Sequence, residues 1–250
     1  MYLFEAFNKP LSASEIAELY NQQLYINVYN TSIVNQLPLL IDFDSTQGTI
    51  QDLTQRNTLT INNVSVNKIK KVYAAYFNGT TTSYISAPLN YQYTSTFNYC
   101  LSLWIYPIRH KSSSICFYNT NQAGGGNEAP IFYWNQTLRK VSMYISSAGS
   151  DSITTTTTLN DRTFYNILYV VNPLSFRYIY INGVLSASGT GSAGTIATVN
   201  ETTQYIGRDS GSNFPYKGYI AKLQIFQGIP NNIPNFAAQL YDSQKSKFGL

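Results

Sequence analysis

The sequence is poor in charge and in the residue types that most often carry chemistry. Only 11% of its 250 residues are charged, and it has one histidine, two cysteines and twelve acidic residues. An average protein has about a quarter of its residues charged. The net charge of +4 is spread thinly, and its densest cluster is Lys68, Lys70 and Lys71. We therefore expect no nucleic-acid partner. Few residues of the types that form catalytic sites are present.

Long apolar runs are also missing. No stretch of about 18 apolar residues occurs, so we expect no membrane span. The opening residues, Met1 to Glu5, lack the basic start and the apolar stretch of a secretion signal.

Aromatic and small polar residues fill the chain instead. Aromatic residues make up 15% of it, with 22 tyrosines, and threonine, serine and asparagine are abundant. This composition favours strands and resembles β-rich proteins at surfaces outside cells. Short strands separated by glycine and asparagine turns predict an all-β fold, a two-sheet antiparallel β-sandwich. The predicted strands are Leu24–Tyr29, Leu37–Phe43, Thr58–Ser65, Val72–Phe77, Tyr84–Ala87, Asn98–Tyr106, Ser114–Tyr118, Ile131–Trp134, Val141–Ser146, Thr154–Thr158, Asn166–Val171, Arg177–Ile181, Gln204–Ile206 and Lys217–Phe226.

Short helices are expected near both termini. Ser12 and Glu15 form a capping box in front of a helix that ends at Gln22. Near the other end, Pro234 is a natural helix starter for a second helix at Asn235–Lys245.

Several motifs together resemble a known family. They are "AAYFNGTTTSYISA" from Ala74, "FNYCLSLWIYP" from Phe97, "YIYINGVL" from Tyr178, "QYIGRD" from Gln204 and "YKGYIAKLQIF" from Tyr216. In this order they resemble the laminin-G-like domains of the concanavalin A-like lectin/glucanase superfamily. The resemblance covers about residues 37–245 and implies a jelly roll of two packed antiparallel sheets. Asp52 stands where that family often has an Asp-x-Ser/Thr turn.

The chain contains two copies of the family's closing segment. "FEAFNKPLSASEIAELYNQ" at residues 4–22 resembles the strand-helix ending of such a domain, and residues 223–244 carry a second, weaker copy. We therefore predict that residues 1–23 resemble the tail of a preceding unit, that 24–36 form a connector and that 37–250 form the sandwich.

Candidate catalytic groups are few. Asp42 and Asp44 alternate on the opening strand, whereas the glucanases of the superfamily carry alternating carboxylates on another strand. We interpret this pair as exposed acids at a strand end, with metal ligation as an alternative. His110 lies in a predicted loop. Lys222 stands where the family often has an acid. We expect no enzyme activity and no cofactor, with calcium as the one ion that the resemblance leaves open.

The two cysteines leave two readings open. Cys100 and Cys116 flank a predicted turn at 107–113, so a simple hairpin would place them opposite each other and allow a disulfide. Two buried free thiols fit the pattern equally well.

Binding residues are predicted from aromatic rings beside polar turns. Such rings suit sugars, and the candidates are Tyr133, Trp134, Asp209, Asn213 and Tyr216. Five glycosylation sequons begin at Asn30, Asn63, Asn78, Asn135 and Asn200.

Two functions are compatible with the sequence. The first is a non-enzymatic structural or adhesive module of a virion or cell surface, with other subunits or neighbouring domains as partners. The second is a lectin-like domain that binds host or envelope glycans. Both place the protein outside the cell or on a virion. A chain of this kind without a visible export signal is then a fragment, has lost its leader, or is packaged into a particle inside a cell.

Overall fold

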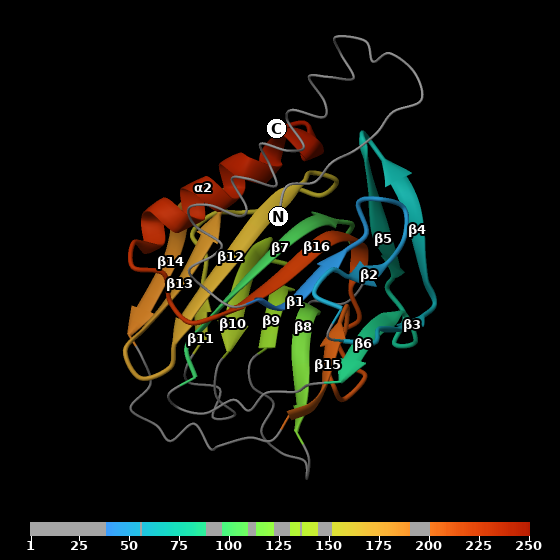
Figure 1. Ribbon diagram of the computed structural model, residues 1–250, viewed down its shortest axis with the longest axis horizontal. Coiled ribbons are helices and arrows are strands. Elements are labelled where there is room, and N and C mark those ends of the chain that lie inside the picture. The colour runs from blue at the N-terminus through green and yellow to red at the C-terminus, as the bar shows by residue number, and fades with distance from the viewer. Residues whose placement is uncertain are drawn as a thin grey trace, which may run out of the picture. The chain divides into compact units, whose positions relative to one another are not determined.

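Two antiparallel sheets, A and B, make up the part of the chain that the computed structural model describes (Figure 1). That part comprises residues 39–55, 57–88, 97–109, 114–122, 131–135, 137–144, 152–190 and 201–250. All of the described residues belong to one compact unit, Leu37–Leu250. The predicted tail at 1–23, the connector at 24–36 and the strand Leu24–Tyr29 lie outside them.

Sheet A has nine strands among the described residues. Its main path is β14 (Val184–Thr190), β13 (Phe176–Ile181), β12 (Tyr165–Asn172), β7 (Tyr99–Pro107), β16 (Lys217–Gln227), β1 (Leu39–Asp44) and β2 (Gln51–Asp52). Off this path, β5 (Val72–Asn78) pairs with both β16 and β4 (Val64–Ile69).

Sheet B has seven strands within the same described ranges. Their order is β11 (Ser152–Thr154), β10 (Lys140–Tyr144), β9 (Ile131–Asn135), β8 (Ser114–Gln122), β15 (Glu201–Ile206), β6 (Tyr84–Pro88) and β3 (Thr60–Asn62). The two-sheet arrangement confirms the predicted β-sandwich.

The core lies between the sheets and follows the period-two alternation of the strands. On β7, Leu101 and Leu103 point into the core, whereas Trp104 faces away from sheet B and packs in a second cluster. On sheet B, β9 contributes Phe132 and Trp134 to the same core. The inward faces of β7 and β9 thus meet in one core between the sheets.

On the side opposite β7, strand β16 is shared by two neighbours. Its first residues pair with β5 and the later ones pair with β1, and its register with β7 shifts between Ile220 and Lys222. Ser45 fills the junction: its Oγ donates to the carbonyls of Ala221 and Ile220 at 3.0 and 3.2 Å and accepts from the Ala75 N–H at 3.0 Å. This serine satisfies backbone groups where one neighbour ends and the other begins.

Two further features follow from local sequence signals. Asn182 and Gly183 take positive φ values of 51° and 78° in the turn between β13 and β14, as a two-residue Asn-Gly hairpin turn requires. Helix α2 (Ile233–Lys245) begins after the N-cap Asn232, whose side chain accepts from the Asn235 N–H, and Pro234 stands in its first turn. It covers the face of sheet A that points away from sheet B, and a short 3₁₀ helix, η2 (Ser246–Phe248), follows it.

One predicted strand was wrong in its extent. The segment Thr58–Ser65 is divided at Asn63, which has a φ of 47°. The residues before the break join sheet B as β3 and those after it join sheet A as β4. In the threonine run, only Thr154 belongs to a strand. The next residues leave the strand, and the Thr156 N–H donates to the Ser186 carbonyl at 2.9 Å.

Within the described residues, no helix is long and apolar enough to cross a membrane.

Candidate functional site

The predicted binding residues of β9 face opposite sides of sheet B. Trp134 is 0% exposed and lies in the core between the sheets. Its neighbour Tyr133 is half-buried and points outward, away from sheet A, because successive side chains alternate. A sugar could therefore stack on Tyr133 but not on Trp134 in this structure.

The other three predicted residues lie in the loop between β15 and β16. Tyr216 is fully buried and its ring packs edge-on against Phe77 and Phe117. The Asp209 carboxylate is also buried and accepts a hydrogen bond from the Asn213 N–H, and burial raises its pKa. Asn213 is exposed. The five predicted residues thus do not form one site, and only Tyr133 and Asn213 keep accessible side chains.

The outward face of sheet B carries a stacked pair of tyrosines beside a row of hydroxyls. The rings of Tyr133 and Tyr144 lie 5.0 Å apart and nearly parallel, at 10°. Next to them, the Oγ atoms of Ser142 and Thr154 are hydrogen-bonded at 2.7 Å across β10 and β11. Burial and then a hydrogen bond with Tyr144 raise the pKa of the Tyr133 phenol, which keeps it neutral.

A second tyrosine pair lies on the same face, across two strand spacings. Tyr84 of β6 and Tyr205 of β15 have ring centroids 5.8 Å apart, and the Arg208 guanidinium lies 3.5 Å and 4.8 Å from those two centroids. Strand β8 runs between the pairs, where Asn119 is opposite Tyr205. Adjacent strands lie about 4.8 Å apart, so β9 and β15 are separated by roughly 10 Å. We call this surface, from Tyr144 to Tyr84, the tyrosine face.

A cleft opens at one edge of the sandwich, between β11 and β14. It has a volume of about 520 Å³. Its lining combines hydroxyl and apolar groups and carries no charged side chain; it consists of Ile153, Thr154, Thr156, Leu185, Ser186, Ala187 and Ser188. Thr154 belongs both to this cleft and to the hydroxyl row beside Tyr133, so the cleft lies at the end of the tyrosine face.

The opposite face, on sheet A, carries the C-terminal helices. The Trp104 ring stacks with Phe248 of η2 at 3.9 Å and with Tyr241 of α2 at 5.9 Å. Its Nε1 donates to Gln244 of α2, whose Nε2 donates to Gln224 of β16 at 3.2 Å. These contacts hold the helix on the sheet and bury the Trp104 ring.

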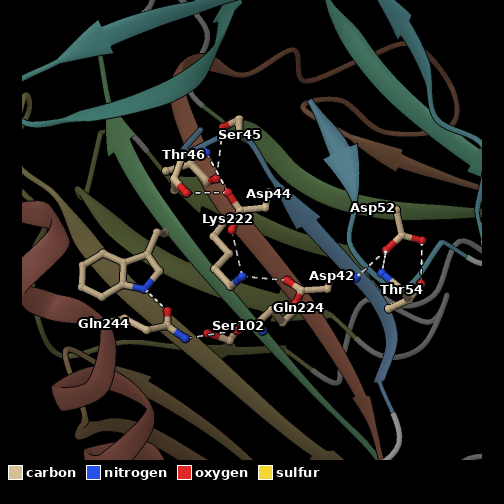
Figure 2. Close-up of polar contacts among 12 residues, drawn as sticks. Asp42, Asp44, Ser45, Thr46, Asp52, Thr54, Ser102, Lys222, Gln224 and Gln244 are labelled. Carbon is tan, nitrogen blue, oxygen red and sulfur yellow. Dashed lines mark hydrogen bonds and ion pairs between the residues drawn. The ribbon is translucent and has the colours of Figure 1, made fainter. Parts of the chain in front are cut away.

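On the same face of sheet A, Asp42, Asp44 and Lys222 form a buried ionic cluster, which Figure 2 shows beside Gln224 and Gln244. The Lys222 Nζ lies 2.8 Å from the Asp42 Oδ1 and 3.0 Å from the Asp44 Oδ2. Both carboxylates are 6% exposed, so the prediction of exposed acids at a strand end was wrong. The sequence did not reveal that Lys222, in the strand where the family often has an acid, pairs with them.

The two carboxylates of this cluster differ in pKa. Burial raises the pKa of Asp42 in spite of the attraction of Lys222. Burial also opposes ionisation of Asp44, but Lys222 and the hydrogen bonds from Thr46 outweigh it and lower the pKa of that carboxyl. Among the residues that the structure describes, no group of three acids, histidines or cysteines is placed to hold a metal ion.

The predicted Asp-x-Ser/Thr turn is present. The Asp52 carboxylate accepts hydrogen bonds from Thr54 through its N–H at 3.1 Å and its Oγ1 at 2.8 Å, and one from the Asp42 N–H at 2.9 Å. Asp52 thus joins β1 to the loop after β2 and has a structural role.

The hairpin that would have joined the cysteines does not form. Cys100 lies in β7 of sheet A, opposite Phe226 and Val170, whereas Cys116 lies in β8 of sheet B, opposite Tyr133. Both cysteines are buried and neither takes part in a disulfide, so the disulfide reading is wrong and the alternative, two buried thiols without a disulfide, is confirmed. Burial raises the pKa of Cys100, which makes it an unreactive thiol.

Three of the five sequons fall on described residues. Asn63 is exposed at the break between β3 and β4. The side chains of Asn78 and Asn135 accept hydrogen bonds within turns, from the Thr80 N–H at 2.9 Å and the Leu138 N–H at 3.0 Å. Asn30, Asn200 and His110 lie outside the described part of the chain.

Comparison with known proteins gives a family and a set of similar folds. A family model described as the concanavalin A-like lectin/glucanases superfamily matches residues 78–231. No curated protein matches the chain significantly.

Three solved structures illustrate the fold. The binding domain of botulinum neurotoxin serotype G is 15% identical, with a TM-score of 0.64 over 84% of this chain and 52% of that one. Domain 4 of AbnA, an extracellular arabinanase from Geobacillus stearothermophilus in complex with arabinotriose, is 18% identical, with a TM-score of 0.60 over 82% and 98%. The serotype D ligand-binding domain in complex with N-acetylneuraminic acid is 14% identical, with a TM-score of 0.63 over 82% and 51%. The chain thus spans about half the length of the toxin domains, and at these identities the likeness concerns the fold.

Proposed function

Because this chain belongs to the concanavalin A-like lectin/glucanase superfamily, we propose that it is a lectin-like module that binds carbohydrate and catalyses no reaction. The glycan lies on the tyrosine face of sheet B. The module works outside the cell, where it attaches its parent particle or protein to a surface that bears glycans.

The observation that carries this proposal is the chemistry of the tyrosine face. A sugar ring offers apolar C–H patches and many hydroxyls, so its binding site needs aromatic surface together with hydrogen-bonding groups. The Tyr133–Tyr144 pair supplies both, since each side chain joins a ring to a phenolic hydroxyl. Tyr84 and Tyr205 repeat the arrangement across the sheet, at a separation that suits a short oligosaccharide.

The environment of the face supports the same function. Ser142 and Thr154 add neutral hydroxyls beside the first pair, and the hydroxyl-lined cleft continues from them. No described helix covers this side, since α2 lies on sheet A. A further support is that AbnA domain 4, which has this fold, was solved with arabinotriose.

The non-enzymatic part of the proposal rests on the acids. Asp42 and Asp44 share the ammonium of Lys222 and are buried on the outer face of sheet A, on the sheet opposite the tyrosine face. A pair of carboxylates in this setting has no access to a sugar on sheet B.

Glycan binding by point variants tests the proposal. The full chain should bind oligosaccharides on a glycan array, and Tyr133→Ala and Tyr144→Ala should each weaken binding by about tenfold, the equivalent of 1.4 kcal/mol. The matched control is Tyr178→Ala, because Tyr178 also stacks on an aromatic neighbour, Phe176, at 4.8 Å, but on sheet A.

Two results would contradict the proposed function. One is a wild-type chain that binds no glycan, and the other is an equal loss of binding in Tyr178→Ala. Trp134→Ala is unsuitable as a probe, because its ring belongs to the core and its removal would destabilise the fold.

A further inference from the structure

Arg208 is held in one position on the tyrosine face. Its guanidinium packs over the rings of Tyr84 and Tyr205. Its Nη1 donates to the Thr81 carbonyl at 2.9 Å and to the Ser212 Oγ at 2.8 Å. The side chain therefore joins the turn before β6, the strand β15 and the loop before β16, and its donors have fixed directions.

The Arg208 guanidinium has N–H donors that these contacts do not use. A guanidinium has five N–H donors, and the two contacts above occupy Nη1 alone. The Nε is buried and has no partner. Across the described ranges, the structure also gives Nη2 no hydrogen-bond acceptor, so this nitrogen keeps its donors for a group outside the fold.

Among the described residues, no ion pair joins Arg208 to a carboxylate. The ion pairs in that part of the chain include those of Arg109 with Asp161, of Lys222 with Asp42 and Asp44, and of Lys245 with Asp242. The neighbouring Asp209 feels the positive charge of Arg208, but its carboxylate turns to the Asn213 N–H and is buried. A cation that is fixed, desolvated on one side and without an ion pair favours an anionic ligand.

We propose that Arg208 recognises an acidic group on the glycan, a carboxylate or a sulfate, at the Tyr84–Tyr205 end of the tyrosine face. This inference rests on the proposed function and adds its substrate class: the module prefers acidic over neutral oligosaccharides. The sugar that carries the acid stacks beside Tyr84 and Tyr205, while its anionic oxygens accept from Nη2. Tyr133 and Tyr144 bind the neutral sugars that follow.

Matched glycans provide the test. The array should contain sets that differ in one group only: an oligosaccharide with a carboxylate, the same core with a sulfate, and the neutral core. The wild-type chain should bind at least one acidic member roughly ten- to a hundredfold more tightly than the neutral one, as expected for a charge-assisted hydrogen bond. The preference should weaken at high salt, because ions screen an exposed charge pair. Preference for the carboxylate or the sulfate set identifies the acidic group.

Variants of Arg208 separate recognition from a structural role. Arg208→Gln should abolish the acid preference and its salt dependence, while binding of the neutral core persists and reports an intact face. Arg208→Lys, which keeps the charge but loses the planar donors, should retain part of the preference. The control is Lys70→Gln, since Lys70 also lies over aromatic rings, 6.0 Å from Tyr106 and 5.9 Å from Phe164, but on sheet A; it should leave the preference unchanged.

The outcomes are distinguishable. Equal binding of acidic and neutral members, or an acid preference that survives in Arg208→Gln, overturns this inference and leaves carbohydrate binding intact. A loss of neutral binding in Arg208→Gln together with a lower unfolding temperature shows a structural arginine and also overturns it. Absence of binding to every glycan on the array refutes the proposed function and this inference together.

Discussion

Replacing Lys222 by methionine should strongly destabilise the protein at neutral pH. The ammonium is the shared partner of Asp42 and Asp44, at 2.8 and 3.0 Å, and the three side chains are at most 9% exposed. Methionine has a similar length but no charge, so it leaves two buried carboxylates without their cation. Breaking a buried ion pair in this way costs about 3–5 kcal/mol of unfolding free energy. For a domain of this size, that corresponds to a fall in Tm of roughly 6–20 °C.

The loss should depend on pH in a defined direction. In the wild type, Asp44 has a lowered pKa, so its contribution is present above the ordinary value of 3.8 and is lost as the pH falls through the folded value. In Lys222→Met, burial raises the pKa of both carboxyls above that of the unfolded chain. The penalty is then full at about pH 7 and fades towards about pH 4, where the buried carboxyls accept protons.

Denaturant unfolding at both pH values measures this effect. Tryptophan fluorescence is a suitable signal, since Trp104 is opposite Lys222 in the pairing of β7 with β16 and contacts α2. The control is Lys245→Met, whose exposed pair with Asp242 should leave the midpoint almost unchanged. Adding Asp42→Asn and Asp44→Asn to Lys222→Met should restore much of the stability. A midpoint equal to that of the wild type at neutral pH, or a larger deficit at low pH, would refute this account of the cluster.

Two further predictions concern the thiols and the Asp52 turn. Because Cys100 and Cys116 are buried and lie in different sheets, neither should react with a thiol reagent in the native protein, and both should react after denaturation without reductant; mass spectrometry that finds them joined would contradict the fold. Asp52→Ala removes a charged acceptor of several hydrogen bonds and should lower the unfolding free energy by about 1.5–3 kcal/mol. Hydrogen bonds lower the pKa of Asp52 against the opposing effect of burial. The loss of unfolding free energy in Asp52→Ala should therefore be present above pH 3.8 and shrink as the pH falls below it. If chemical unfolding gave the same loss at every pH, the ionised carboxylate would not be the stabilising group.

The fold class could be predicted from the sequence because its signals are local. The period-two alternation in β7 and β16 marks strands wherever it occurs. Asn182-Gly183 requires a tight turn through its backbone preference alone, and Pro234 begins α2 for the same kind of reason. The Asp52 turn depends on residues within five positions of one another. Resemblance to the superfamily then indicated how these strands assemble.

The sites could not be predicted in the same way, because alternation defines two faces of a strand without saying which one is buried. Trp134 and Tyr133 were equal candidates for sugar binding until the packing of sheet B against sheet A placed one in the core and the other outside. Cys100 and Cys116 seemed to face each other until β7 and β8 joined different sheets. Strand pairing is decided by the whole set of strands, and the turn between two of them does not fix it.

Contacts between distant segments were decided by the tertiary structure alone. Lys222 meets Asp44 across 178 positions in the sequence, and Arg208 reaches Thr81 across 127. By itself the sequence determined the strands, the turns and the C-terminal helix, since these follow from the conformational preferences of neighbouring residues. Only the tertiary structure decided that the paired acids are buried on the outer face of sheet A, and that two tyrosine pairs and an arginine share the outer face of sheet B. Those placements depend on which surfaces exclude water when distant segments pack together.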